Sequence, residues 1–133
     1  MKKTVIILGL VFIFANESKA TTYQLSTENL AEFSIYSNSP FHLAISKGDV
    51  ESVKKFISYG ADVNKIVNNM TPLMVAARFN QVEIIKILLE KGADLSAEND
   101  RGLTALHFAE FGKSTESIAI LKERKDKSNR KRK

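Results

Sequence analysis

A short segment recurs three times along this chain, and its spacing limits the folds that the chain can adopt. Residues 39–51 read SPFHLAISKGDVE, residues 71–83 read TPLMVAARFNQVE, and residues 104–116 read TALHFAEFGKSTE. The segments start at nearly equal intervals, and the second interval is one residue longer than the first. Self-similarity at a period of this length is typical of stacked repeat proteins, in which each unit buries its apolar face against its neighbours.

Each copy has the pattern of two short helices joined by a turn. In the second copy Thr71 is a predicted helix cap, because its hydroxyl oxygen can accept a backbone N–H, and Pro72 suits the first helical position. Asn80 is expected to end this helix, in the place that Gly48 has in the first copy, because both residue types tolerate a left-handed backbone. A second helix is expected from about Val82 to Lys91, and its apolar residues need cover on more than one side.

The phrase Gly-Ala-Asp follows the second helix in two of the copies, at Gly60 and at Gly92. Each glycine is predicted to cap the C-terminus of that helix in the left-handed conformation. The chain should then turn outward into the loops VNKIVNNM (63–70) and LSAENDRGL (95–103). The first loop is one residue shorter than the second, which accounts for the unequal intervals between the segments.

These phrases resemble the ankyrin repeat, with its Thr-Pro-Leu-His-x-Ala turn and its unit of about 33 residues. The resemblance covers about residues 38–122 and implies an all-α solenoid of about three helix-turn-helix repeats (38–68, 69–101 and 102–122) with short finger loops. It also implies that His42 and His107 form hydrogen bonds that tie one turn to its neighbour, in preference to a metal or acid–base site.

The residues favour a binding function over an enzyme. No Ser/His/Asp arrangement has suitable spacing, the chain contains no Cys, and there is no Gly-rich phosphate loop. Glu51, Glu83 and Glu116 recur at one repeat position, which indicates solvated helix starts where the helix dipole favours anions. We therefore expect no catalytic residue, metal, cofactor or small-molecule substrate, and we expect a monomer.

The first 20 residues have the pattern of a cleaved secretory signal peptide. Lys2 and Lys3 precede an apolar run at 4–15, and small residues at Ser18 and Ala20 predict cleavage after Ala20. The alternatives are a buried helix or a membrane anchor, but the run is shorter than the roughly 20 residues that span a bilayer. A periplasmic or secreted protein is expected, with residues 21–37 forming an extension whose helix caps the first repeat.

The C-terminal end carries most of the positive charge. Residues 122–133 contain eight Lys or Arg and two Asp or Glu, whereas residues 21–121 have a net charge of −3. Residues 123–133 are predicted to form a basic disordered tail. Two interpretations of Lys122–Lys133 stay open: electrostatic binding to an anionic surface (membrane, cell wall or nucleic acid) with the repeats as scaffold, or a tail that only keeps the last repeat soluble.

The ankyrin resemblance implies that a protein partner binds the concave face formed by the finger loops and the ends of the first helices. Carried over by position, the partner-binding residues are Lys47, Val67, Asn68, Met70, Arg78, Phe79, Asp100, Arg101, Leu103 and Phe111. Lys47, Phe79 and Phe111 each precede the predicted inner turn at equal intervals along the chain, which predicts a stripe across the stack. The alternative is that both Phe side chains pack between adjacent first helices. The predicted function is a protein–protein interaction module in an exported compartment, with a partner that the sequence does not identify.

Overall fold

The structure is a computed structural model that describes residues 39–133. The predicted signal peptide and the predicted capping helix in residues 21–37 lie outside the described residues. In the part of the chain that the structure describes, no helix is both long enough and apolar enough to span a bilayer.

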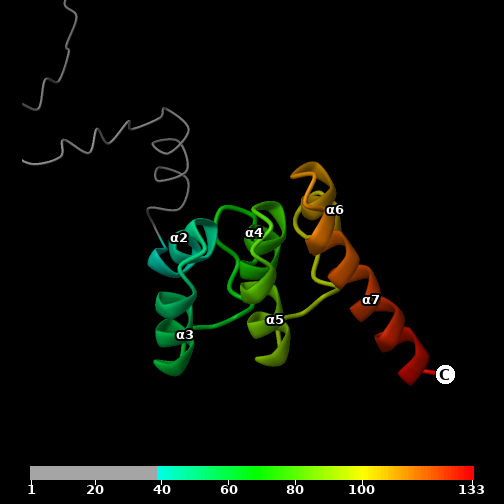
Figure 1. Cartoon of the computed structure of the whole chain (residues 1–133), viewed down its shortest axis with the longest axis horizontal. Helices are drawn as coiled ribbons and strands as arrows, with labels where there is room; N and C mark the ends of the chain where they lie inside the picture. Colours follow the sequence, from blue (N-terminus) through cyan, green and yellow to red (C-terminus); the bar gives the residue numbers. More distant parts are fainter. Residues whose placement is uncertain (1–38) are drawn as a thin grey trace, which may run out of the picture.

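Three helix pairs lie side by side in the described region (Figure 1). The helices are α2 (Pro40–Lys47), α3 (Val50–Ser58), α4 (Pro72–Arg78), α5 (Val82–Glu90), α6 (Ala105–Phe111) and α7 (Thr115–Lys131). The first helices of the pairs, α2, α4 and α6, form one row, and α3, α5 and α7 form the second row. The predicted all-α repeat solenoid is confirmed.

The ends of the helices follow the predicted residue chemistry. The Thr71 hydroxyl oxygen accepts the backbone N–H of Met74 at 3.2 Å, which caps α4. Gly48 and Asn80 end α2 and α4 with φ angles of 72° and 54°, in the left-handed region that the sequence predicted. The third copy makes the same turn with Lys113, at φ 52°.

The first finger loop ends in a two-residue turn. The backbone groups of Val67 and Met70 exchange hydrogen bonds of 3.0 and 3.1 Å, and Asn68 and Asn69 between them have φ angles of 50° and 62°. Left-handed conformation at both central residues is the type I′ hairpin turn, which Asn adopts more readily than most residues. The tip therefore has a defined backbone conformation.

The second finger loop ends in a turn that is one residue longer. The Asn99 N–H donates to the Leu103 carbonyl at 3.0 Å, and Gly102 between them has a φ of 70°. This extra residue explains why the third segment of the repeat starts one residue later than equal intervals would place it.

The core runs through the middle of the stack, and the second repeat is its most buried part. Residues 72–77, which are all of α4 except Arg78, are buried, whereas in α6 only Ala105 and Ala109 are. Helix α4 is covered by α2 on one side and by α6 on the other. Helix α6 has no further repeat packed on its outer side in the described region, so a polar residue is tolerated there. Glu110 of α6 is an example, and it occupies the repeat position that the buried Ala77 has in α4.

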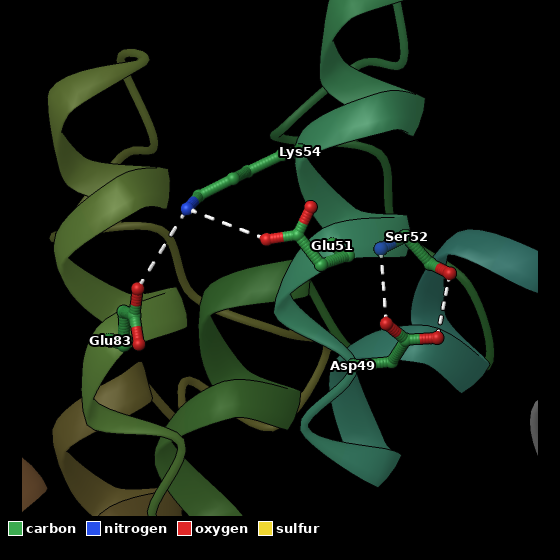
Figure 2. A network of polar contacts seen from close by, with 5 residues as sticks. All are labelled: Asp49, Glu51, Ser52, Lys54 and Glu83. Carbon is green, nitrogen blue, oxygen red and sulfur yellow. Dashed lines mark hydrogen bonds and ion pairs between the residues drawn. The ribbon is translucent and has the colours of Figure 1, made fainter.

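An exposed polar network joins the first two repeats (Figure 2). Lys54 on α3 lies 4.0 Å from Glu51 and 3.9 Å from Glu83 on α5. Asp49 caps α3 by accepting the backbone N–H and the hydroxyl of Ser52 at 3.0 and 2.6 Å, and these hydrogen bonds lower the pKa of Asp49. Exposed ion pairs typically contribute about 0–1 kcal/mol, so this network adds little to the coupling of the repeats.

The basic C-terminal segment is helical, which differs from the disordered tail that the sequence predicted. Helix α7 continues from Thr115 to Lys131 (Figure 1). Its first part is anchored because Leu121 is buried in the core, and the residues that follow include neither Gly nor Pro. Glu123 and Lys127 form an ion pair one helical turn apart. The anchored start and the local helix preference together extend the helix into solvent.

Candidate functional site

A groove of about 350 Å³ lies between the second and third repeats, on the side of the finger loops. It is bounded by both finger tips and by the C-terminal ends of α4 and α6. The residues that line it are Asn68, Asn69, Met70, Arg78, Asn99, Arg101, Leu103, Phe108 and Phe111. Six of the ten residues predicted to bind a partner are among them, namely Asn68, Met70, Arg78, Arg101, Leu103 and Phe111.

The two fingers that form one wall of the groove are hydrogen-bonded to each other. The side-chain oxygen of Asn69 accepts the backbone N–H of Asp100 at 3.0 Å. Within the second finger, the side-chain oxygen of Asn99 accepts the N–H groups of Arg101 and Leu103, both at 3.0 Å. These bonds restrict the conformational freedom of the two tips.

The opposite wall is formed where α4 and the turn after α6 approach closely. The Ser114 hydroxyl donates to the Arg78 carbonyl at 3.1 Å. A Cβ placed on Gly112 would lie 2.1 Å from that same carbonyl oxygen, so only glycine permits this approach. The close contact sets the distance between the ends of the two first helices and hence the width of the groove.

The predicted stripe of Lys47, Phe79 and Phe111 is wrong. The left-handed turn residues of the second and third repeats are Asn80 and Lys113, and the interval between them is one residue longer than the interval between the two Phe residues. Phe111 is therefore the counterpart of Arg78. The position that corresponds to Phe79 is occupied by a glycine, because the backbone of α4 leaves no room for a side chain there.

The two aromatic side chains consequently have different environments. Phe79 is half-buried and packs against the core, and the Arg78 guanidinium carbon lies 5.6 Å from its ring centre. Phe111 is 65% exposed, and its ring centre lies 6.1 Å from that of Phe108 in an edge-on arrangement. Of the two, Phe111 is the one available to a partner at the groove.

Four of the predicted site residues do not line the groove: Lys47, Val67, Phe79 and Asp100. Lys47 lies in the last turn of α2, in the first repeat. Sequence reasoning missed Asn69, Asn99 and Phe108. The Asn-Asn pair at 68–69 was a signal for the first of these, since it is typical of a two-residue hairpin turn.

His42 ties the first repeat to the end of the first finger loop, as the ankyrin resemblance implied. Its Nε2–H donates to the carbonyl of Met70 at 3.3 Å, and its Nδ1 accepts from the Ser39 hydroxyl at 2.8 Å. Burial lowers the pKa of His42, so the ring is neutral near pH 7. His107 is exposed, and its Nδ1 accepts the backbone N–H of Thr104 at 3.0 Å within its own turn.

The groove offers guanidinium, amide and apolar groups. Its lining contains no His, Cys, Asp or Glu. Across residues 39–133, no group of three or more His, Asp or Glu side chains is arranged to hold a metal ion.

A family model described as "Ankyrin repeats (3 copies)" matches residues 12–99 and, in a second alignment, residues 41–132. The chain belongs to the ankyrin-repeat family. Ankyrin repeats generally mediate protein–protein interaction and are typically non-catalytic, and the groove agrees with such a role.

Three ankyrin-repeat relatives illustrate how widely this module is used. The chain is 37% identical over 102 residues to human transient receptor potential cation channel subfamily A member 1, covering 75% of this chain and 9% of the channel. It is 30% identical over 119 residues to the phosphocholine transferase AnkX of Legionella pneumophila, and the alignment covers 86% of this chain and 12% of the transferase. It is 38% identical over 82 residues to a putative ankyrin repeat protein of Rickettsia bellii, and the alignment covers 56% of this chain and 49% of that protein. The chain thus spans about a tenth of the first two relatives and about half of the third, and the likeness concerns the repeats.

Proposed function

We propose that this ankyrin-repeat chain is a non-enzymatic binding protein that holds a partner protein in the groove between its second and third repeats. The observation that carries this proposal is the exposed ring of Phe111, which lies at a groove where most of the predicted contact residues meet. Large aromatic side chains are enriched among the residues that contribute most to binding energy.

The packing of the groove supports a binding role for the Phe111 ring. The ring makes an edge-on contact with Phe108, and the backbone that follows it at Gly112 is fixed by the close approach to the Arg78 carbonyl. A contact of this kind reduces the side-chain entropy that is lost when a partner covers the ring. Leu103, which is half-buried in the same lining, extends the apolar area beside the ring.

The proposal can be tested by placing a photo-crosslinking phenylalanine analogue at position 111 in the native host. The matched control is the same analogue at Tyr59, which is 85% exposed at the end of α3, outside the groove. We expect a discrete crosslinked protein from position 111 only, and we expect Leu103→Ser to reduce its yield. Equal crosslinking from both positions, or none from position 111, would contradict a role for the groove.

We also propose that the protein acts after export, in the periplasm or outside the cell. The support is the pattern of residues 1–20, with its basic start, short apolar run and small residues before the cleavage position. N-terminal sequencing of the protein from the periplasmic fraction should then begin at Thr21. An intact Met1 on protein from the cytoplasmic fraction would contradict export.

A second candidate function is attachment to an anionic surface through α7. This helix has 17 residues, compared with nine in each of α3 and α5, and all eight Lys and Arg side chains of residues 122–133 are exposed. Replacement of Lys125, Arg130 and Lys131 by Gln should abolish co-sedimentation with phosphatidylglycerol vesicles at low salt. Binding of this kind should also weaken steeply as salt shortens the screening length. Equal vesicle binding by the Gln variant would exclude this function.

A further inference from the structure

We infer, on the basis of the protein-binding role proposed above, that the groove takes an extended peptide segment in which an Asp or Glu side chain neighbours a large apolar side chain. The carboxylate would lie at Arg78 and Arg101, and the apolar side chain would lie on Leu103, Phe108 and Phe111.

Two cations from different repeats supply the charge. Arg78 ends α4 and Arg101 lies in the second finger, and both line the groove. Within residues 39–133 the ion pairs are made by Lys54 and Lys127, and neither arginine is paired with a carboxylate. A guanidinium presents its N–H donors in a fork that matches the two oxygens of a carboxylate. The groove therefore has two groups ready for a carboxylate that this part of the chain does not provide.

Arg78 is also positioned for this contact. Its guanidinium carbon lies 5.6 Å from the ring centre of Phe79, and the Ser114 hydroxyl bonds its backbone carbonyl. An arginine held against an aromatic face has already lost part of its side-chain freedom. Binding a carboxylate then costs less entropy than it would with a freely rotating side chain.

The rest of the lining distinguishes a peptide from a free anion. Phe111 is 65% exposed beside half-buried Leu103, and burying this apolar surface requires an apolar group on the ligand. The side-chain oxygens of Asn69 and Asn99 are used within the fingers, and their amide nitrogens donate to no acceptor in the described region. These amides can donate to the backbone carbonyls of an extended segment. A volume of about 350 Å³ is at the lower end for ligand clefts and suits side chains better than a whole cofactor.

The test is a selection of random dodecamer peptides, displayed on phage, against the full chain and against its Arg78→Gln/Arg101→Gln variant. The charge-matched control is Lys47→Gln/Lys91→Gln, which removes two cations that do not line the groove. We expect the full chain and the lysine variant to enrich peptides with Asp or Glu close in sequence to Leu, Ile, Phe or Met. The arginine variant should lose this enrichment. In fluorescence anisotropy, a selected peptide with Glu replaced by Gln should bind at least about tenfold more weakly, as hydrogen bonds to charged groups predict.

Several outcomes would overturn the inferred specificity. The first is that no peptides are enriched, and the second is that the Glu and Gln peptides bind equally well. The third is that the lysine variant loses enrichment as much as the arginine variant does, which would indicate that only long-range charge attracts the peptides. Enrichment of purely apolar peptides that contain neither Asp nor Glu would do the same. If such apolar peptides still require Phe111, by comparison with Phe111→Ser, the binding groove stands and only its preference for carboxylates falls. If selected peptides bind the Phe111→Ser variant unchanged, the proposed binding function fails as well.

Discussion

Asn80 joins the second and third repeats, and its replacement provides a sharp test of how they are coupled. Its backbone is left-handed, with φ 54°, and its side-chain oxygen accepts the backbone N–H of Ser117 at 3.2 Å and the Ser117 hydroxyl at 2.8 Å. Ser117 is fully buried in the first turn of α7, where a helix leaves backbone N–H groups without a partner inside the helix. Ser114, which precedes α7, makes no side-chain cap. The cap of α7 is therefore supplied by the preceding repeat.

Asn80→Gly keeps the left-handed backbone but removes this acceptor. Each buried polar group left without a partner costs about 1–3 kcal/mol. Because removal of the exposed Asn80 side chain lets water reach part of the site, we expect the free energy of unfolding to fall by about 2 kcal/mol. In a domain of this size about 1 kcal/mol shifts the melting temperature by about 4–8 °C, so Tm should fall by about 10 °C.

Asn80→Asp is the matched control, because Asp also tolerates a left-handed backbone and keeps an oxygen acceptor for Ser117. A negative charge near the start of α7 is favourable as well. Its stability should stay within about 0.5 kcal/mol of the parent, the range of a neutral surface substitution. Both variants can be compared by thermal and urea unfolding, followed by far-UV circular dichroism. The reasoning is refuted if the Gly variant melts with the parent chain, or if the Asp variant loses as much stability as the Gly variant.

Three further predictions concern the packing and the titration of single residues. Gly112→Ala should cost about 1–3 kcal/mol in urea unfolding, because its Cβ would lie 2.1 Å from the Arg78 carbonyl oxygen; a smaller change would show that the two helix ends can separate freely. Because burial lowers the pKa of His42 below its ordinary value of 6.5, the unfolded chain binds this proton more readily. The stability contribution of His42 should be full above pH 6.5 and should decrease as the pH falls below that value, and His107→Asn should retain this decrease while His42→Asn loses it. Phe111→Ser should change the unfolding free energy by less than about 0.5 kcal/mol, because the ring is 65% exposed, and a larger loss would place it in the core.

The repeat pattern and the turn residues could be predicted because they depend on short stretches of chain. Thr71 before Pro72 specifies a helix start, and a residue that tolerates a positive φ, such as Gly48 or Asn80, specifies its end. The tail was predicted less well. Its charge was read as disorder, whereas its helix preference and the buried anchor at Leu121 extend α7 to Lys131.

The site was predicted only in outline, since exposure depends on neighbours in space. The sequence pattern suggested that Phe79 and Phe111 both directly precede the inner turn of their repeats, and both were therefore predicted to contact a partner. The longer second finger shifts the third repeat by one residue, which leaves one ring half-buried and the other exposed. Similarly, the pairing of Asn69 with the second finger joins residues that are 31 positions apart in the sequence, and no local pattern predicts such a bond.

The amino-acid sequence by itself determined the repeat period, the starts of the helices and the turns that end α2 and α4. These features follow from backbone preferences and apolar patterns that act within a few residues. Only the tertiary structure decided which aromatic ring is free, how close α4 and α6 approach at Gly112, and which side chains meet in one groove. The physical reason is that burial and close packing are properties of adjacent repeats, and each repeat's neighbours decide which of its side chains remain available to a partner.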